Sequence, residues 1–121
     1  MNKYLIPHTV YHKTQWLIRD YARLREEYAN TGTLSAVDYD GMPHGSEASD
    51  PTLRDALRRA EIAADLKAID AGLRKLPEEY REGVLNSIVN HDRYPDTAHL
   101  NTWKRWRQRL VYWVAYEKGW I

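Results

Sequence analysis

Apolar residues recur at helical spacing along most of this chain, beginning near its N-terminus. Between residues 9 and 28 they fall at steps of one, three and four positions: Trp16, Leu17, Tyr21, Leu24 and Tyr28. Side chains three and four positions apart share one face of an α-helix, so the pattern predicts a single N-terminal helix within residues 1–30. Gly32 follows soon after the last member of this stripe and is typical of a helix end.

A second apolar stripe predicts a long helix over residues 51–76. Its members are Leu53, Leu57, Ala60, Ala64, Ile69, Leu73 and Leu76. Asp50 is a suitable N-cap, and Pro51 suits the first helical position because an N–H there would have no partner within the helix. Residues 31–50 have no apolar period and are rich in Gly, Ser and Asp, so we expect them to form a mobile loop.

The C-terminal part, residues 77–121, predicts two further helices and a short connection. Pro77 interrupts the preceding helix and opens a new one, whose apolar face is Tyr80, Val84, Leu85, Ile88 and Val89. One helical turn is expected after Pro95, and a last helix over residues 102–118. The fold class is therefore all-α in a single domain of residues 1–121, with a long N-terminal helical hairpin followed by a helix-turn-helix-like part.

Positive charge is concentrated at the C-terminal end of the chain. The 121 residues carry a formal net charge of +1, and 29% of them are charged. Residues 101–121 hold five Lys and Arg against one Glu, whereas residues 1–100 are slightly acidic. Four of the five Trp residues also lie in this last segment. A basic segment rich in aromatic residues favours an anionic partner, most often nucleic acid.

The composition argues against a secreted or membrane protein. The chain has no cysteine, so it forms no disulfide and no thiolate metal site. It has no apolar run of about 18 residues, so no transmembrane helix and no membrane partner are expected. Its first residues lack the apolar stretch of a secretory signal. We therefore expect a cytoplasmic protein.

No pattern of residues predicts an enzyme, a cofactor site or a metal site. The sequence has no glycine-rich phosphate loop, nucleophile elbow or metal-hydrolase motif. Glu78 and Glu79 are adjacent, so they do not face one site on a helix, and they suit the positive end of the helix dipole instead. Neither histidine pair has the spacing of a known metal site: His8 with His12, and His91 with His99.

The candidate functional residues lie in the first turns of the last predicted helix. They are Lys104, Arg105, Arg107, Gln108 and Arg109. On a helix anchored by its Trp residues, these side chains would project from the N-terminal half, as in the recognition helix of a DNA-binding protein. Arg and Lys reach phosphates and guanine edges, and the Gln108 amide is suited to adenine. Double-stranded DNA is thus the expected partner. The alternative is a packed helix with a solvated basic edge.

Two segments resemble a known family. Residues 40–46 read Asp-Gly-Met-Pro-His-Gly-Ser and are followed by Ser-Asp-Pro-Thr at residues 49–52. Residues 69–81 carry a Leu-Pro-Glu-Glu step that is similar to the start of the sigma region-four helix-turn-helix. Together they resemble small phage and prophage sigma-factor-like transcriptional regulators of the RinA and ArpU type. The resemblance implies an all-helical regulator whose last helix binds DNA.

Two other functions stay open at this point. One is a protein-interaction module that binds RNA polymerase, another phage protein or a second copy of itself. Its anchors would be Tyr112, Tyr116 and Trp120, because Trp, Tyr and Arg dominate binding hot spots. The other is an accessory protein of phage packaging or morphogenesis.

Overall fold

The computed structural model describes residues 3–38 and 45–121, and the side chains of residues 3–30 and 53–121 among them. Within these ranges the chain is all-helical and contains no strand. The helices are α1 (His8–Arg19), α2 (Tyr21–Asp38), α3 (Gly45–Arg74), α4 (Glu78–Asn90) and α5 (Leu100–Glu117). The expectation of an all-α fold class is confirmed.

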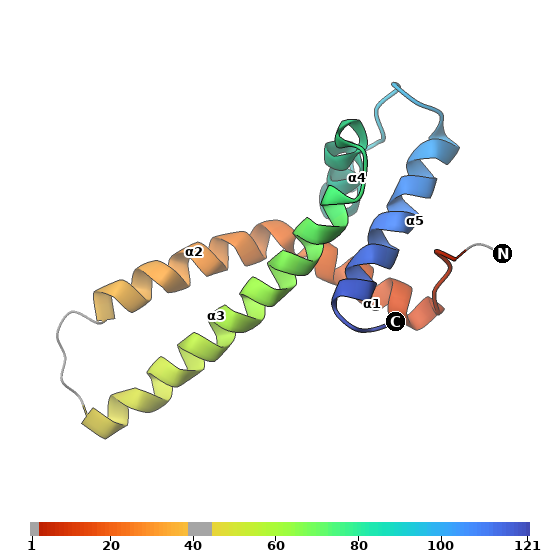
Figure 1. The fold of residues 1–121 in the computed structure, drawn as a ribbon. Coiled ribbons are helices and arrows are strands. Elements are labelled where there is room, and N and C mark those ends of the chain that lie inside the picture. Colours follow the sequence, from red (N-terminus) through yellow and green to blue (C-terminus); the bar gives the residue numbers. More distant parts are fainter. Residues whose placement is uncertain (1–2, 39–44) are drawn as a thin grey trace.

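The helices form a body with a long arm attached to it (Figure 1). In the arm, α2 and the first part of α3 lie side by side and run in opposite directions. In the body, α5 packs against the second part of α3, and α1 contacts both α4 and α5. The prediction of a hairpin between one continuous first helix and the long second helix is not confirmed in that form, because α1 belongs to the body.

The first predicted helix is divided at Asp20. The backbone N–H of Asp20 donates to the carbonyl of Leu17 at 3.1 Å, which tightens the end of α1 before α2 starts. The side chains buried on α1 differ from those of the predicted stripe. Ile18 is fully buried, whereas Trp16, a member of the predicted apolar stripe, is 63% exposed. The buried face of α1 therefore includes Thr14 and Ile18 and excludes Trp16.

Much of the segment 31–50, expected to be a loop, is helical. α2 continues to Asp38 and α3 already begins at Gly45, so Pro51 lies inside α3 and not at its start. Residues 39–44 lie outside the described residues. Once a helix is nucleated, each further residue adds one hydrogen bond at the cost of ordering only that residue. Loss of an apolar period therefore does not end a helix by itself.

The core lies where α1, α3, α4 and α5 meet. Its large buried side chains are Ile18, Ile69, Leu76, Val84, Ile88, Trp103, Leu110, Val111 and Val114. Two glycines let the helices approach closely. A Cβ at Gly72 would stand 2.8 Å from a Val114 methyl group, and a Cβ at Gly83 would stand 2.6 Å from the Trp103 ring. These contacts fix α5 against α3 and α4.

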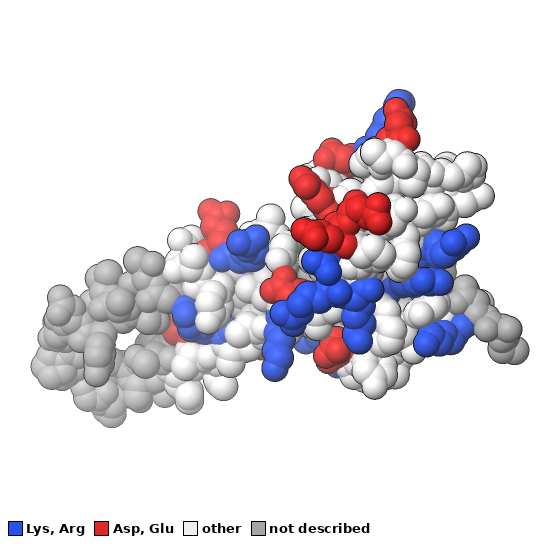
Figure 2. All heavy atoms as spheres, turned by 45° about the horizontal axis from the view of Figure 1, so that its top comes forward, with Lys and Arg blue, Asp and Glu red and all other residues white. Residues whose placement is uncertain are grey.

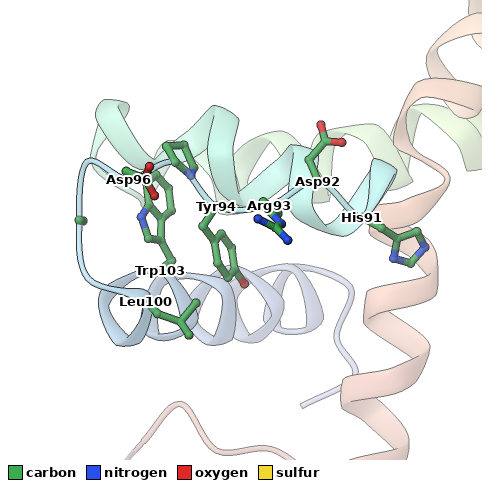
Figure 3. Close-up of a pocket in the computed structure, with 9 residues that line it drawn as sticks. His91, Asp92, Arg93, Tyr94, Asp96, Leu100 and Trp103 are labelled. Carbon is green, nitrogen blue, oxygen red and sulfur yellow. The ribbon is translucent and has the colours of Figure 1, made fainter.

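The connection between α4 and α5 differs from the expected one. The chain leaves α4 at His91, whose φ of 58° is left-handed, and residues 91–99 contain a turn at Asp96 and Thr97 in place of a helical turn. The connection runs back along α4 before α5 begins, so the two helices point in the same general direction (Figure 3). A helix-turn-helix uses a turn of about three or four residues. The predicted helix-turn-helix arrangement is therefore not confirmed.

Candidate nucleic-acid interface

The Trp-rich helix α5 is anchored as the sequence indicates. Trp103 and Leu110 are buried, and Trp106 and Trp113 are half-buried. Trp103 stacks on Tyr94 with ring centroids 5.6 Å apart, and Trp106 stacks on Tyr80 at 5.6 Å. This packing leaves one side of the first turns of α5 facing outward, and Lys104 and Arg105 are exposed there.

The N-terminal segment packs along that same side of α5. The Tyr4 ring meets the Tyr112 ring edge-on at 5.1 Å and lies 6.2 Å from the Trp113 ring. The amide nitrogen of Gln108 donates a hydrogen bond to the Tyr4 carbonyl at 2.7 Å. Lys3 extends over the Tyr4 and Trp113 rings. Two segments more than 100 positions apart in the sequence thus build one surface.

A basic groove lies between these two segments. It has a volume of about 550 Å³ and is lined by Lys3, Tyr4, Asn101, Lys104, Arg105, Gln108 and Arg109. Four of these seven residues are cations and none is a carboxylate. We call this set of seven residues the basic groove. The arrangement can hold an anion that carries several charges, because no lining residue neutralises the cations.

Arg109 forms part of the wall of the basic groove. Its guanidinium carbon lies 4.7 Å from the centre of the Tyr4 ring and 4.8 Å from that of Trp106. Its Nε is buried and has no hydrogen-bond partner among the described residues. A guanidinium between two aromatic faces keeps its charge and its direction. The Arg109 guanidinium is therefore held in one position and keeps its positive charge in the basic groove.

Arg107 points away from the basic groove and ties elements together. Its Nη1 donates to the hydroxyl of Ser87 in α4 at 3.2 Å. Burial acts to lower the pKa of Arg107, but interactions with Tyr94 and Tyr11 outweigh burial and raise that pKa. Arg107 is thus committed to contacts with α1, α4 and the connection. Of the five residues predicted to bind DNA, it alone is absent from the groove lining.

The five predicted residues therefore divide by role. Lys104 and Arg105 are exposed and ready for a ligand, and Arg109 is held in the wall. To contact an adenine, the Gln108 amide would have to give up its hydrogen bond to the N-terminal segment. The sequence reasoning missed Lys3 and Tyr4. Their basic and aromatic character matches that of α5, but no local pattern indicates a contact over such a distance along the chain.

A second hollow lies at the connection between α4 and α5 (Figure 3). It has a volume of about 410 Å³ and is lined by residues 91–96, Ala98, Leu100 and Trp103. Figure 3 shows Tyr94 and Trp103 side by side, with Arg93 and Asp92 nearer the end of α4. Its charges are mixed, because Asp92 and Asp96 accompany Arg93. This hollow therefore lacks the uniform positive charge of the basic groove.

Figure 2 shows both basic and acidic side chains on the face that it draws. The largest acidic group lies beside a band of basic side chains, and further acidic side chains are scattered over the same face. Glu78, Glu79 and Glu82 contribute exposed carboxylates on α4. A polyanion would be repelled by these carboxylates and attracted to the basic groove.

The aromatic anchors expected for a protein partner are mostly engaged within the chain. Tyr112 packs on Tyr4 and Trp113. Two ammonium groups lie near the Trp120 ring, that of Lys13 at 4.0 Å and that of Lys118 at 5.6 Å from its centre. Of the three, Tyr116 is the exposed one.

The other candidate groups are surface residues. The Nε2 atoms of His8 and His12 lie 3.0 Å apart in one exposed pair. His99 accepts a hydrogen bond from the backbone N–H of Asn101 at 3.0 Å and so caps α5. Among the residues that the structure describes, no three His, Cys, Asp or Glu side chains gather as a metal site would require.

Comparison with known proteins does not assign this chain to a family. No protein-family profile, curated protein or solved structure matches this chain. Within the described ranges, none of the helices combines the length and the apolar character that a membrane crossing needs.

Proposed function

We propose that this protein binds double-stranded DNA through the basic groove and acts as a transcriptional regulator of the phage or prophage type. The observation that carries the proposal is the composition of the groove, which brings Lys3, Lys104, Arg105 and Arg109 together without a carboxylate. The DNA backbone carries closely spaced negative charges, and Lys and Arg supply most phosphate contacts in DNA-binding proteins.

The exposed cations make the main contribution to this binding. Lys104 and Arg105 are consecutive exposed residues on the outward side of α5 and reach a ligand without breaking a contact inside the protein. The N-terminus of α5, at Leu100, adds the positive end of a helix dipole near them. Four phosphate contacts would give a slope of about −3.5 for the logarithm of the binding constant against the logarithm of salt concentration.

Fluorescence anisotropy with a labelled random duplex tests the proposal. Titrations at about 50 mM and 200 mM salt are expected to show binding that weakens by about 100-fold between the two conditions. The double variant Lys104→Ala/Arg105→Ala should bind at least ten times more weakly and lower the slope by about 2. The matched control, Lys67→Ala/Arg74→Ala, removes the same charge from exposed positions on α3. It should bind the duplex far more tightly than the groove variant does.

Two results would overturn the proposal. One is no binding at low salt. The other is an equal loss of affinity in the groove variant and in the α3 control, because net charge would then explain the binding. The regulatory role is tested separately by selecting duplexes from a random library on the immobilised protein. Enrichment of one sequence supports a regulator, and binding without enrichment contradicts that part of the proposal.

A further inference from the structure

Helix α3 presents an apolar stripe on the side that faces away from α2. On the side toward α2, Ile62 is fully buried, Arg58 donates to Glu27 at 2.8 Å and Arg59 donates to the Tyr28 carbonyl at 3.1 Å. The other stripe is formed by Leu53, Leu57, Ala60 and Ala64, all exposed. We call these four residues the outer stripe.

The outer stripe is continuous and lies opposite the α2 contact. Its members are spaced by four, three and four residues, so they line up on a helix that turns by about 100° per residue. Ile62 and Arg58 lie roughly half a turn around the helix from it. Leu53 is 58% exposed and Leu57 is 61% exposed, so the described chain leaves the stripe largely open. Figure 1 shows α2 along one side of the arm and no other helix along the opposite side.

This spacing is the signature of a helix that packs against another helix on that side. Apolar residues at alternating steps of three and four form the seam of a coiled coil, and a helix with apolar residues on opposite faces is normally covered on both. The two leucines lie at one end of the outer stripe and the two alanines at the other. An antiparallel partner with the same stripe therefore sets large side chains against small ones.

We infer that the outer stripe pairs with the outer stripe of a second copy of this chain, in antiparallel orientation about a two-fold axis. In the register that sets Leu57 against Ala60 of the second copy, Leu53 meets Ala64. The flanking charges then match as well. Arg54 and Glu61 lie on one flank of the stripe, seven residues apart, and the same register brings Arg54 of each copy beside Glu61 of the other. A parallel pair would set leucine against leucine and would not join these charges.

The dimer should be weak and in equilibrium with the monomer. The outer stripe consists of only four side chains on one helix. Two such stripes bury less surface than the roughly 1,200 Å² of a stable interface. A dissociation constant of about 10–100 µM is therefore expected. Two copies would place their basic grooves in a two-fold arrangement, but the pairing does not depend on DNA binding and is tested without DNA.

Sedimentation equilibrium of the full chain between about 5 and 500 µM tests the inference. The mass should rise from 14.3 kDa toward twice that value as concentration increases. Leu57→Glu, at an exposed position that tolerates the change in the folded monomer, should weaken pairing by more than tenfold. The matched control Leu5→Glu changes an equally exposed leucine outside the arm and should leave pairing unchanged. A monomer at all concentrations, or equal behaviour of both variants, would overturn the inference.

Charge reversal tests the antiparallel register. Arg54→Glu alone and Glu61→Arg alone each place like charges together at both ends of the interface and should weaken pairing by about three- to tenfold. The double variant Arg54→Glu/Glu61→Arg restores opposite charges and should recover wild-type pairing. If the double variant is as weak as the single ones, the antiparallel register is wrong.

Discussion

Among the glycines whose surroundings the structure describes, Gly83 has the least room for a side chain. An added Cβ would stand 2.6 and 2.8 Å from two carbons of Trp103 and 3.1 Å from Pro95. Trp103 is buried and stacked on Tyr94, so its ring cannot move aside easily. Gly83→Ala gains up to about 1 kcal/mol of helix propensity, but the clash should outweigh it and destabilise the fold by about 1–3 kcal/mol. Urea unfolding followed by circular dichroism measures the difference.

Glu82→Ala is the control for this experiment. Glu82 precedes Gly83 in α4 and is exposed, so its replacement keeps the helix and removes no buried contact. A change within about 0.5 kcal/mol is expected. If Gly83→Ala is as stable as this control, α4 and α5 do not approach as closely as described.

Tyr21 links the arm to the body and makes stability sensitive to alkaline pH. Its hydroxyl donates to an Asp70 carboxylate oxygen at 2.6 Å. Burial, the hydrogen bond to Asp70 and the charge of Asp70 all raise the pKa of Tyr21 above its ordinary value. A raised pKa in the folded state means that the contribution is complete below the unfolded pKa of about 10 and is lost as pH rises through the folded pKa.

The variant Tyr21→Phe tests this contribution. At neutral pH it should be less stable by about 1–2 kcal/mol, because Asp70 loses its donor. Unfolding in urea at about pH 8 and pH 11 should show that the difference from the wild type shrinks at the higher pH. Tyr116→Phe, at an exposed tyrosine, serves as control and should follow the wild type at both pH values. A difference that is constant with pH would contradict the proposed titration.

The end of α4 depends on a residue in a conformation that glycine adopts more easily. His91 has φ 58° and ψ 28°, and the following N–H, of Asp92, donates to the Asn86 carbonyl at 3.4 Å. Because His91 is exposed, its side chain contributes little packing. His91→Gly should therefore stabilise the protein by about 0.5–1 kcal/mol. Thermal and urea unfolding are the measurements.

Asn90→Gly, at the neighbouring position, should have the opposite effect on stability. Asn90 is the last residue of α4 and is exposed, so a glycine there gains nothing from a left-handed conformation and loses helix propensity. It should destabilise by a few tenths of a kcal/mol to about 1 kcal/mol. Equal effects of the two substitutions would show that the left-handed conformation at His91 carries no strain.

Helix positions could be predicted from the sequence more accurately than helix faces. The predicted bounds of α4 and α5 lie within a few residues of the observed ones, because apolar spacing and Gly/Pro punctuation are local signals. The same spacing does not show what covers a face. Leu57 belongs to the predicted second stripe and is exposed on the arm, whereas Ile18 was not placed in the first stripe and is fully buried.

The candidate site could be predicted in part for the same reason. Lys104 and Arg105 follow from their helical positions and are exposed as expected. Arg107 has the same charge and lies close by in sequence, but its direction around the helix turns it toward Ser87. Lys3 reaches the site through contacts between the two ends of the chain, and periodicity within either end contains no information about that contact.

At the scale of the whole molecule, the two ends of the chain depend on each other to form the basic groove. Tyr4 is the centre of this contact, because it packs on Tyr112, lies against the Arg109 guanidinium and presents its carbonyl to Gln108. Tyr4→Ala should release the N-terminal segment with Lys3 and leave Arg109 without one of its two aromatic walls. The exposed cations Lys104 and Arg105 would stay in place on α5.

Tyr4→Ala therefore tests whether DNA binding requires the N-terminal segment in addition to α5. Affinity for a random duplex, measured by anisotropy at low salt, should fall by about three- to tenfold, and the salt slope should decrease by about 1 as the Lys3 contact is lost. Leu5→Ala, at the adjacent exposed residue, should retain wild-type affinity and slope. Unchanged affinity in Tyr4→Ala would mean that α5 alone forms the binding surface, because in that case the N-terminal segment contributes packing but no charge to the ligand.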